Sequence, residues 1–120
     1  AVRARIRGFA GHDTFMNQLQ RASHSDQSGE APLLFVHAGI NAAKPLDAQG
    51  DALWWDGQSF DTIHEAYRPF HKVVRGYDPA HRGMHLNCVT ATIDDGCGFG
   101  GELICAGFDA SGEVTAILEN

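Results

Sequence analysis

The most continuous apolar stretch of the chain covers residues 32–36 and is followed by His37-Ala38-Gly39. Five apolar residues are too few for a helix, so this run predicts a strand that is buried on both faces. Two further segments, 71–75 and 89–93, also stop at glycine or polar residues and predict two more strands. Polar residues at the exits of such strands are where open α/β sheets place ligand-binding groups.

The remaining pattern predicts short helices and a final hairpin. Residues 2–9 alternate basic and apolar positions and predict a short strand or an extended entry. A basic solvent face explains Arg3, Arg5 and Arg7 at least as well as a phosphate-binding arm. Helical spacing predicts a helix over 12–22, and the polar stretch 23–30 predicts a loop. The later helical segments are one turn over 51–55 and a short helix over 59–67 with Ser59 as its cap.

The C-terminal part predicts strands without helices between them. A glycine-rich loop at 98–101 precedes two strands, 102–108 and 113–118, joined by a turn at 109–112. The order of elements predicts an α/β fold that becomes α+β at its C-terminal end and finishes in an antiparallel meander. With 120 residues, a single domain or part of one is expected over 1–120.

Composition narrows the class of partner. The chain has 9 Lys and Arg against 15 Asp and Glu, a formal net charge of -6, which argues against a nucleic-acid partner. No apolar run reaches the roughly 20 residues of a membrane crossing, and no signal peptide is visible. Cys88, Cys97 and Cys105 are an odd number at wide spacing, which favours reduced thiols and a cytoplasmic location.

Seven histidines raise the question of metal binding, although no close-packed metal motif is present. His81 and His85 are four residues apart, but Arg82 and Gly83 between them favour a loop over a metal-binding helix. His37 stands out because it ends the most apolar strand just before two small residues. From position alone, a ligand and a histidine bonded to a carbonyl are equally good interpretations.

Four segments, taken in order, resemble the C-terminal half of a calcineurin-like metallophosphatase, from its branch of bacterial serine/threonine phosphatases and dinucleoside tetraphosphatases. The segments are residues 35–39, 53–55, 73–76 and 93–103. The resemblance implies half of a β-sandwich flanked by helices and a phosphorylated substrate. It also implies divalent manganese, iron or zinc in the complete domain, with His37 as a metal ligand and Tyr77 in the place of a second histidine ligand.

Several features of that family are missing. The three early ligand motifs are absent, Asp56-Gly57 stands where an arginine often follows the Leu-Trp segment, and Tyr77 is a poor ligand for divalent metals when neutral. One histidine cannot hold two cations, so three interpretations stay open: a fragment, a non-catalytic relative, or one chain of a split enzyme. The absence of an initiator methionine favours the fragment. A homo-oligomer, or pairing with a missing N-terminal half, is then expected because a sheet edge would be exposed.

Overall fold

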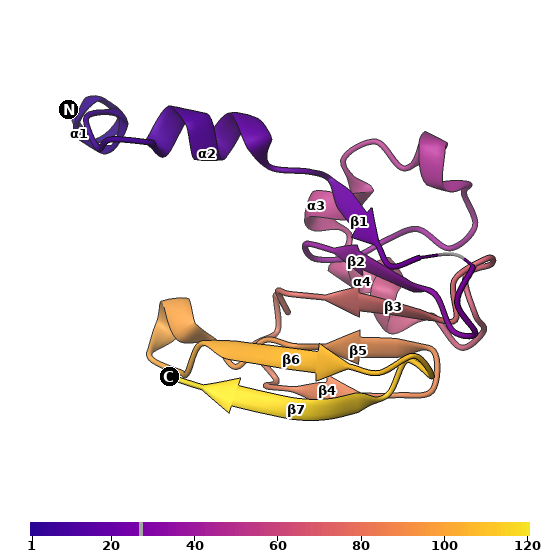
Figure 1. The fold of residues 1–120 in the computed structure, drawn as a ribbon. Helices are drawn as coiled ribbons and strands as arrows, with labels where there is room; N and C mark the ends of the chain where they lie inside the picture. The colour runs from indigo at the N-terminus through magenta and orange to yellow at the C-terminus, as the bar shows by residue number, and fades with distance from the viewer. Residues whose placement is uncertain (27) are drawn as a thin grey trace.

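The computed structural model describes residues 1–26 and 28–120 as a mixed α/β fold with two sheets (Figure 1). The larger sheet has five strands in the order β1-β2-β3-β5-β4. Its centre is parallel, and the two outer strands run antiparallel to their neighbours. The strands are β1 (Ala22–His24), β2 (Leu33–Val36), β3 (Lys72–Arg75), β4 (His85–Leu86) and β5 (Thr90–Thr92).

The main core lies between one face of this sheet and the helical segment that follows β2. That segment contains the 3₁₀ helix η1 (Leu46–Ala48), α3 (Ala52–Trp55) and α4 (Gly57–Asp61). Side chains alternate along a strand, so Leu34 and Val36 share the face that receives the helices. The buried cluster is Leu34, Val36, Ile40, Leu53, Phe60, Ile63, Phe70 and Val73.

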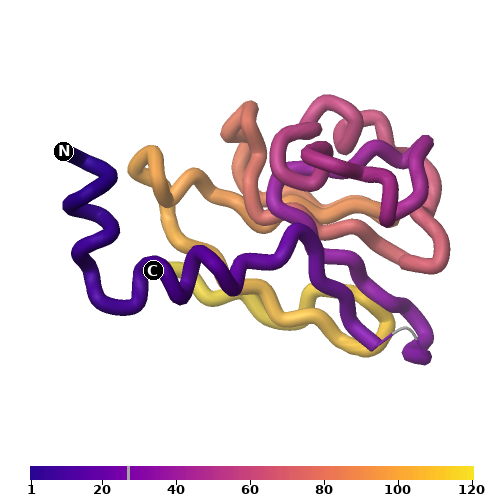
Figure 2. Tube along the Cα trace, turned by 90° about the horizontal axis from the view of Figure 1, so that it is seen from above, coloured from indigo at the N-terminus to yellow at the C-terminus, as the bar shows by residue number. Residues whose placement is uncertain are grey.

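A hairpin packs on the other face of the sheet. It is formed by β6 (Ile104–Phe108) and β7 (Val114–Glu119), which pair only with each other. The rings of Phe35 and Phe108 meet edge to face with centroids 6.0 Å apart, and the buried Lys72 reaches Glu113 at 3.3 Å. Figure 2 shows the hairpin and the helical segment on opposite sides of the sheet.

The first residues form an arm that projects from the body (Figures 1 and 2). It contains α1 (Val2–Arg7) and α2 (His12–Gln18), neither of which has a buried residue. The strand predicted over 2–9 is therefore wrong. Alanine and arginine favour helix, and residues 2–7 form α1 instead of adding a strand to the sheet.

Three other expectations need correction. The helix predicted over 12–22 ends at Gln18, because Ala22 already pairs with Val36 in β1. β1 also includes residues 23 and 24 of the loop predicted over 23–30, of which residue 27 lies outside the described residues. The helix predicted over 59–67 covers Gly57–Asp61, and its cap is Asp56, whose carboxylate accepts the Ser59 amide at 3.0 Å. The predicted meander is divided: β4 and β5 belong to the large sheet, whereas β6 and β7 form a separate one.

The strands predicted over 32–36, 71–75 and 89–93 are confirmed as β2, β3 and β5, and the final hairpin is confirmed as β6 and β7. The glycine-rich loop contains one 3₁₀ turn, η2 (Cys97–Phe99). Among residues 1–26 and 28–120, none of the helices has the length and apolar character that a membrane crossing demands.

Candidate functional site at the carboxyl edge of the sheet

The structure brings the two residues predicted as metal ligands into contact. His37 follows β2 and Tyr77 follows β3, and their rings are stacked with centroids 5.3 Å apart and planes inclined by 11°. Because β2 and β3 are parallel neighbours, both side chains leave the sheet at the same edge. His37 is exposed and Tyr77 is half-buried, so the pair is open to a ligand.

Main-chain bonds fix this contact. The carbonyl oxygen of His37 accepts the amides of Gly76 at 3.1 Å and Tyr77 at 3.0 Å. The next turn is equally constrained, because a Cβ on Gly39 would overlap the carbonyl oxygen of Asp56. The small residue after His37-Ala38 is thus required by a close backbone approach between the end of β2 and the start of α4.

Two tryptophans border the His37 side of the pair. The centroid of the His37 ring lies 5.7 Å from that of Trp54 and 6.3 Å from that of Trp55, the latter meeting it edge to face. Trp55 is 73% exposed, an unusual position for the largest apolar side chain. An exposed aromatic side chain beside a strand exit offers a stacking surface to a ligand.

The Tyr77 side of the pair continues into a second aromatic contact. His81 meets Tyr77 edge to face at 5.9 Å between ring centroids and lies 4.2 Å from the ring of Phe99. His81 has a φ of 49°, a left-handed conformation that is rare outside glycine and costs free energy. Phe99, in η2, is 71% exposed. His85, considered as a partner of His81, instead lies in β4.

The metal expected from the family resemblance has too few ligands here. His37 offers one ring nitrogen, and Tyr77 offers one phenol that stacks on the His37 ring. Within the described ranges, no three His, Cys, Asp or Glu side chains are grouped so as to hold a metal ion. A two-metal centre needs several oxygen and nitrogen donors, so His37 and Tyr77 cannot hold such a centre by themselves.

A charged cluster beneath this edge holds the loop that carries Tyr77. Arg75 is 2% exposed; its Nε donates to Thr92 Oγ1 at 2.9 Å, and its Nη2 contacts Asp61 at 3.1 Å and Asp78 at 3.2 Å. Arg82 closes the cluster by donating to Asp78 Oδ2 at 2.7 Å and to both Asp61 oxygens at 2.8 and 2.9 Å. We call Asp61, Arg75, Asp78 and Arg82 the arginine–aspartate clamp.

The two arginines of the clamp keep the buried carboxylate of Asp78 ionised. Asp78 is 1% exposed, and the Arg82 guanidinium that donates to it holds its pKa well below the usual range of an aspartate. Amides of Ala80 and Arg82 and the charge of Arg75 lower the pKa further, whereas burial opposes them. The same bonds to Asp78 and Asp61 raise the pKa of Arg82. The two positive and two negative groups of the clamp balance in charge, and Nη1 of Arg75 is buried without a hydrogen-bond partner among the described residues.

Asp94 links the Tyr77 loop to the glycine-rich loop. One of its carboxylate oxygens accepts the Asp78 amide at 2.8 Å, and the other accepts the Gly96 amide at 2.9 Å. Gly101 is packed against the carbonyl of Asp95, where a Cβ would overlap it. The Asp94-Asp95-Gly96 motif therefore positions η2, and with it Phe99, beside His81.

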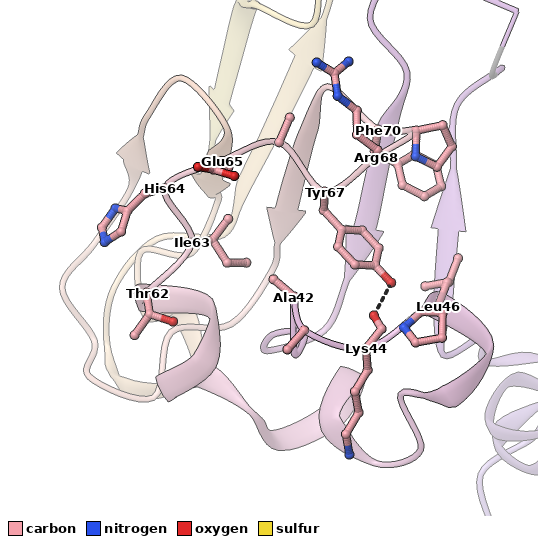
Figure 3. A pocket seen from close by; sticks show the side chains of 14 residues that line it. Ala42, Lys44, Leu46, Thr62, Ile63, His64, Glu65, Tyr67, Arg68 and Phe70 are labelled. Carbon is pink, nitrogen blue, oxygen red and sulfur yellow. Dashed lines mark hydrogen bonds between the residues drawn. The ribbon is translucent and has the colours of Figure 1, made fainter.

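Hollows also lie elsewhere, and the one next to the clamp is lined by charged and polar side chains that include Asp61, Arg75, Asp78 and Arg82. A hollow of about 920 Å³ lies near the beginning of β3, between the loop around Lys44 and residues 62–70 (Figure 3). Tyr67 points across it and donates its hydroxyl to the Lys44 carbonyl at 2.8 Å, while burial raises the pKa of this tyrosine. A smaller hollow of about 430 Å³ adjoins the clamp.

Comparison with family models, with curated proteins and with solved structures finds no match for this chain. The interpretation of the site therefore depends on its residues and geometry. Reasoning from the sequence missed the clamp and the contact of His81 with Tyr77. A usable signal was present in Lys72 and Arg75, two charged residues within a predicted strand, because a charge that becomes buried in a sheet requires a partner.

Proposed function

We propose that this chain is the His-Ala-Gly part of a metal-dependent phosphoesterase domain. In this proposal His37 is a metal ligand, and the edge that holds His37 and Tyr77 faces a phosphorylated substrate. The supporting observation is that two positions singled out in separate motifs, far apart in the sequence, are stacked at the ends of adjacent parallel strands. That is the place where α/β sheets bind ligands.

The proposal includes donors that the described residues do not supply. Hydrolysis assisted by two metals requires carboxylates that bridge and neutralise the ions, and none converges on His37 within the described ranges. Such donors would come from another segment or another chain. We therefore expect the 120-residue chain alone to show no turnover of p-nitrophenyl phosphate with added manganese. Robust turnover by the purified chain would contradict the ligand count.

Metal binding by the edge itself can be measured directly. Zinc titration followed by NMR of the imidazole nitrogens should shift the His37 resonances first, and His37→Ala should remove the tightest binding. The matched control is His64→Ala, because His64 is an exposed histidine away from this edge. Equal loss of binding in both variants, or none in His37→Ala, would exclude His37 as the ligand.

A specific observation favours a second candidate, a non-catalytic binding module. Tyr77 occupies the position of the expected second histidine and lies flat against His37, and the exposed Trp55 and Phe99 extend this aromatic surface. Such a surface binds planar groups without a metal.

Tyr77→His distinguishes the two candidates. If the edge is a metal site that has lost a ligand, a second imidazole should tighten zinc binding by about tenfold or more, which corresponds to about 1.4 kcal/mol. Unchanged zinc affinity, with Tyr77→Phe also unchanged, favours the binding module. Thermal unfolding of each variant serves as the folding control.

A further inference from the structure

The outer edge of the C-terminal hairpin has little protection against strand pairing: its one irregularity of register leaves Thr115 without an opposite residue and lies before Ile117. β7 has six residues, from Val114 to Glu119, with one charge at its end and neither lysine, proline nor glycine. In the large sheet the outer strands are short, three residues in β1 and two in β4, which is a common protection of sheet edges. Except for Val114, every residue of β7 is exposed.

The pairing register shows which main-chain groups of β7 are unpaired. Leu103 and Asn120 exchange both of their hydrogen bonds. Bonded and non-bonded pairs alternate in an antiparallel ladder, so Cys105–Leu118 is the next bonded pair and Ile104–Glu119 and Ala106–Ile117 are non-bonded. The N–H and C=O groups of Ile117 and Glu119 therefore point away from β6. β7 pairs with no other strand of the described chain.

The two faces of the hairpin differ in their surroundings. Phe108 packs on Phe35, so the side chains of Ile104, Ala106 and Phe108 face the large sheet. Leu118 is on the opposite face, where it is 69% exposed, and Leu103 on the same face is 60% exposed. A two-stranded sheet is marginal by itself, and an exposed apolar outer face adds to the free energy that a further strand would gain.

We propose that β7 pairs antiparallel with β7 of a second copy of this chain, which joins the two hairpins into one four-stranded sheet. A two-fold axis at Leu118 places Leu118 against Leu118 of the second copy and Ile117 against Glu119. The outward groups of Ile117 and Glu119 then form about four main-chain hydrogen bonds. No like charges face each other in this register, since Glu119 is the strand's only charged residue.

Pairing of two β7 strands with the axis at Leu118 also buries apolar surface of both copies. The central Leu118 pair is non-bonded, the type in which side chains approach most closely, and it covers the most exposed apolar side chain of the hairpin. β6 is the weaker candidate because it contains Gly107 and is mostly half-buried. The proposal concerns the hairpin alone and does not depend on the function proposed for the His37 edge.

Sedimentation equilibrium of the 120-residue chain in reducing buffer tests the proposal. The chain should change from 13.0 kDa to twice that mass as its concentration rises through the micromolar range. Leu118→Lys places two like charges at the axis and should weaken the dimer by about tenfold or more. The matched control is Leu103→Lys, which adds the same charge to the same face but lies just before β6, away from the outer edge of β7, and it should remain dimeric.

A second pair of variants tests the main-chain bonds. Glu119→Pro removes an outward N–H while leaving the bonds to β6 intact, so the dimer should weaken, whereas Glu119→Gln should dimerise normally. Hydrogen exchange of the Ile117 and Glu119 amides should slow as the concentration of the wild-type chain increases. A monomer at every concentration would overturn the proposal and leave the edge to a strand of a different protein. Wild-type affinity in Leu118→Lys or Glu119→Pro would also overturn it.

Discussion

Replacing Asp78, the buried acid of the clamp, by asparagine should destabilise the protein strongly. Asp78 is 1% exposed and contacts Arg82 at 2.7 Å, Arg75 at 3.2 Å and the Ala80 amide at 3.0 Å. Asparagine keeps the volume but removes the negative charge and directs an amide N–H₂ group at a guanidinium. Breaking a buried ion pair from one side costs about 3–5 kcal/mol.

The structure indicates the lower end of that range. The Arg82 side chain is 50% exposed and can turn towards water, and Asp61 still contacts Arg75 after the substitution. We therefore expect a loss of about 3 kcal/mol in the free energy of unfolding. With a urea m-value of about 1.5 kcal/mol/M, the unfolding midpoint should fall by about 2 M.

Urea unfolding followed by circular dichroism measures this change. The matched control is Asp51→Asn, because Asp51 is exposed and makes no capping bond with its side chain, so it should stay within about 0.5 kcal/mol of wild type. A loss below about 1 kcal/mol for Asp78→Asn would refute the reasoning, since the clamp would then contribute little to stability.

Three further outcomes are expected. The pKa of Asp78 is lowered in the folded state, so the stability that the ionised carboxylate contributes is complete above the unfolded-state pKa of about 3.9. This stability is lost as the pH falls from there towards the lower pKa of the folded state, so acid titrations of stability should be steeper for wild type than for Asp78→Asn. Gly39→Ala should cost about 1–3 kcal/mol in urea unfolding because its Cβ meets the backbone of Asp56, whereas Gly76→Ala, with open space around it, should be close to neutral. Tyr67→Phe should lower the unfolding free energy by about 1 kcal/mol through the lost hydroxyl bond, and equal stability of the two proteins would show that this bond contributes nothing.

The site could be predicted from the sequence only in part. His37 and Tyr77 each follow a predicted strand, and two such strands that pair in parallel direct their exits to one edge. The pattern could not show that the rings stack, nor that His81 and Phe99 join them, because those contacts depend on the paths of two loops. Whether His37 binds a metal stays a proposal.

What the sequence determined by itself was the set of segments whose own pattern is decisive. Short segments rich in β-branched and apolar residues and bounded by glycine and polar residues were enough to predict β2, β3, β5 and the final hairpin, and the continuous apolar run of β2 also predicted its burial. Tertiary structure decided the rest. Ala22–His24 is a strand only because β2 offers it a partner, and Asp78 is held ionised only because Arg75 and Arg82 converge on it. Pairing and charge compensation join residues that are distant in the chain, so a local pattern does not contain them.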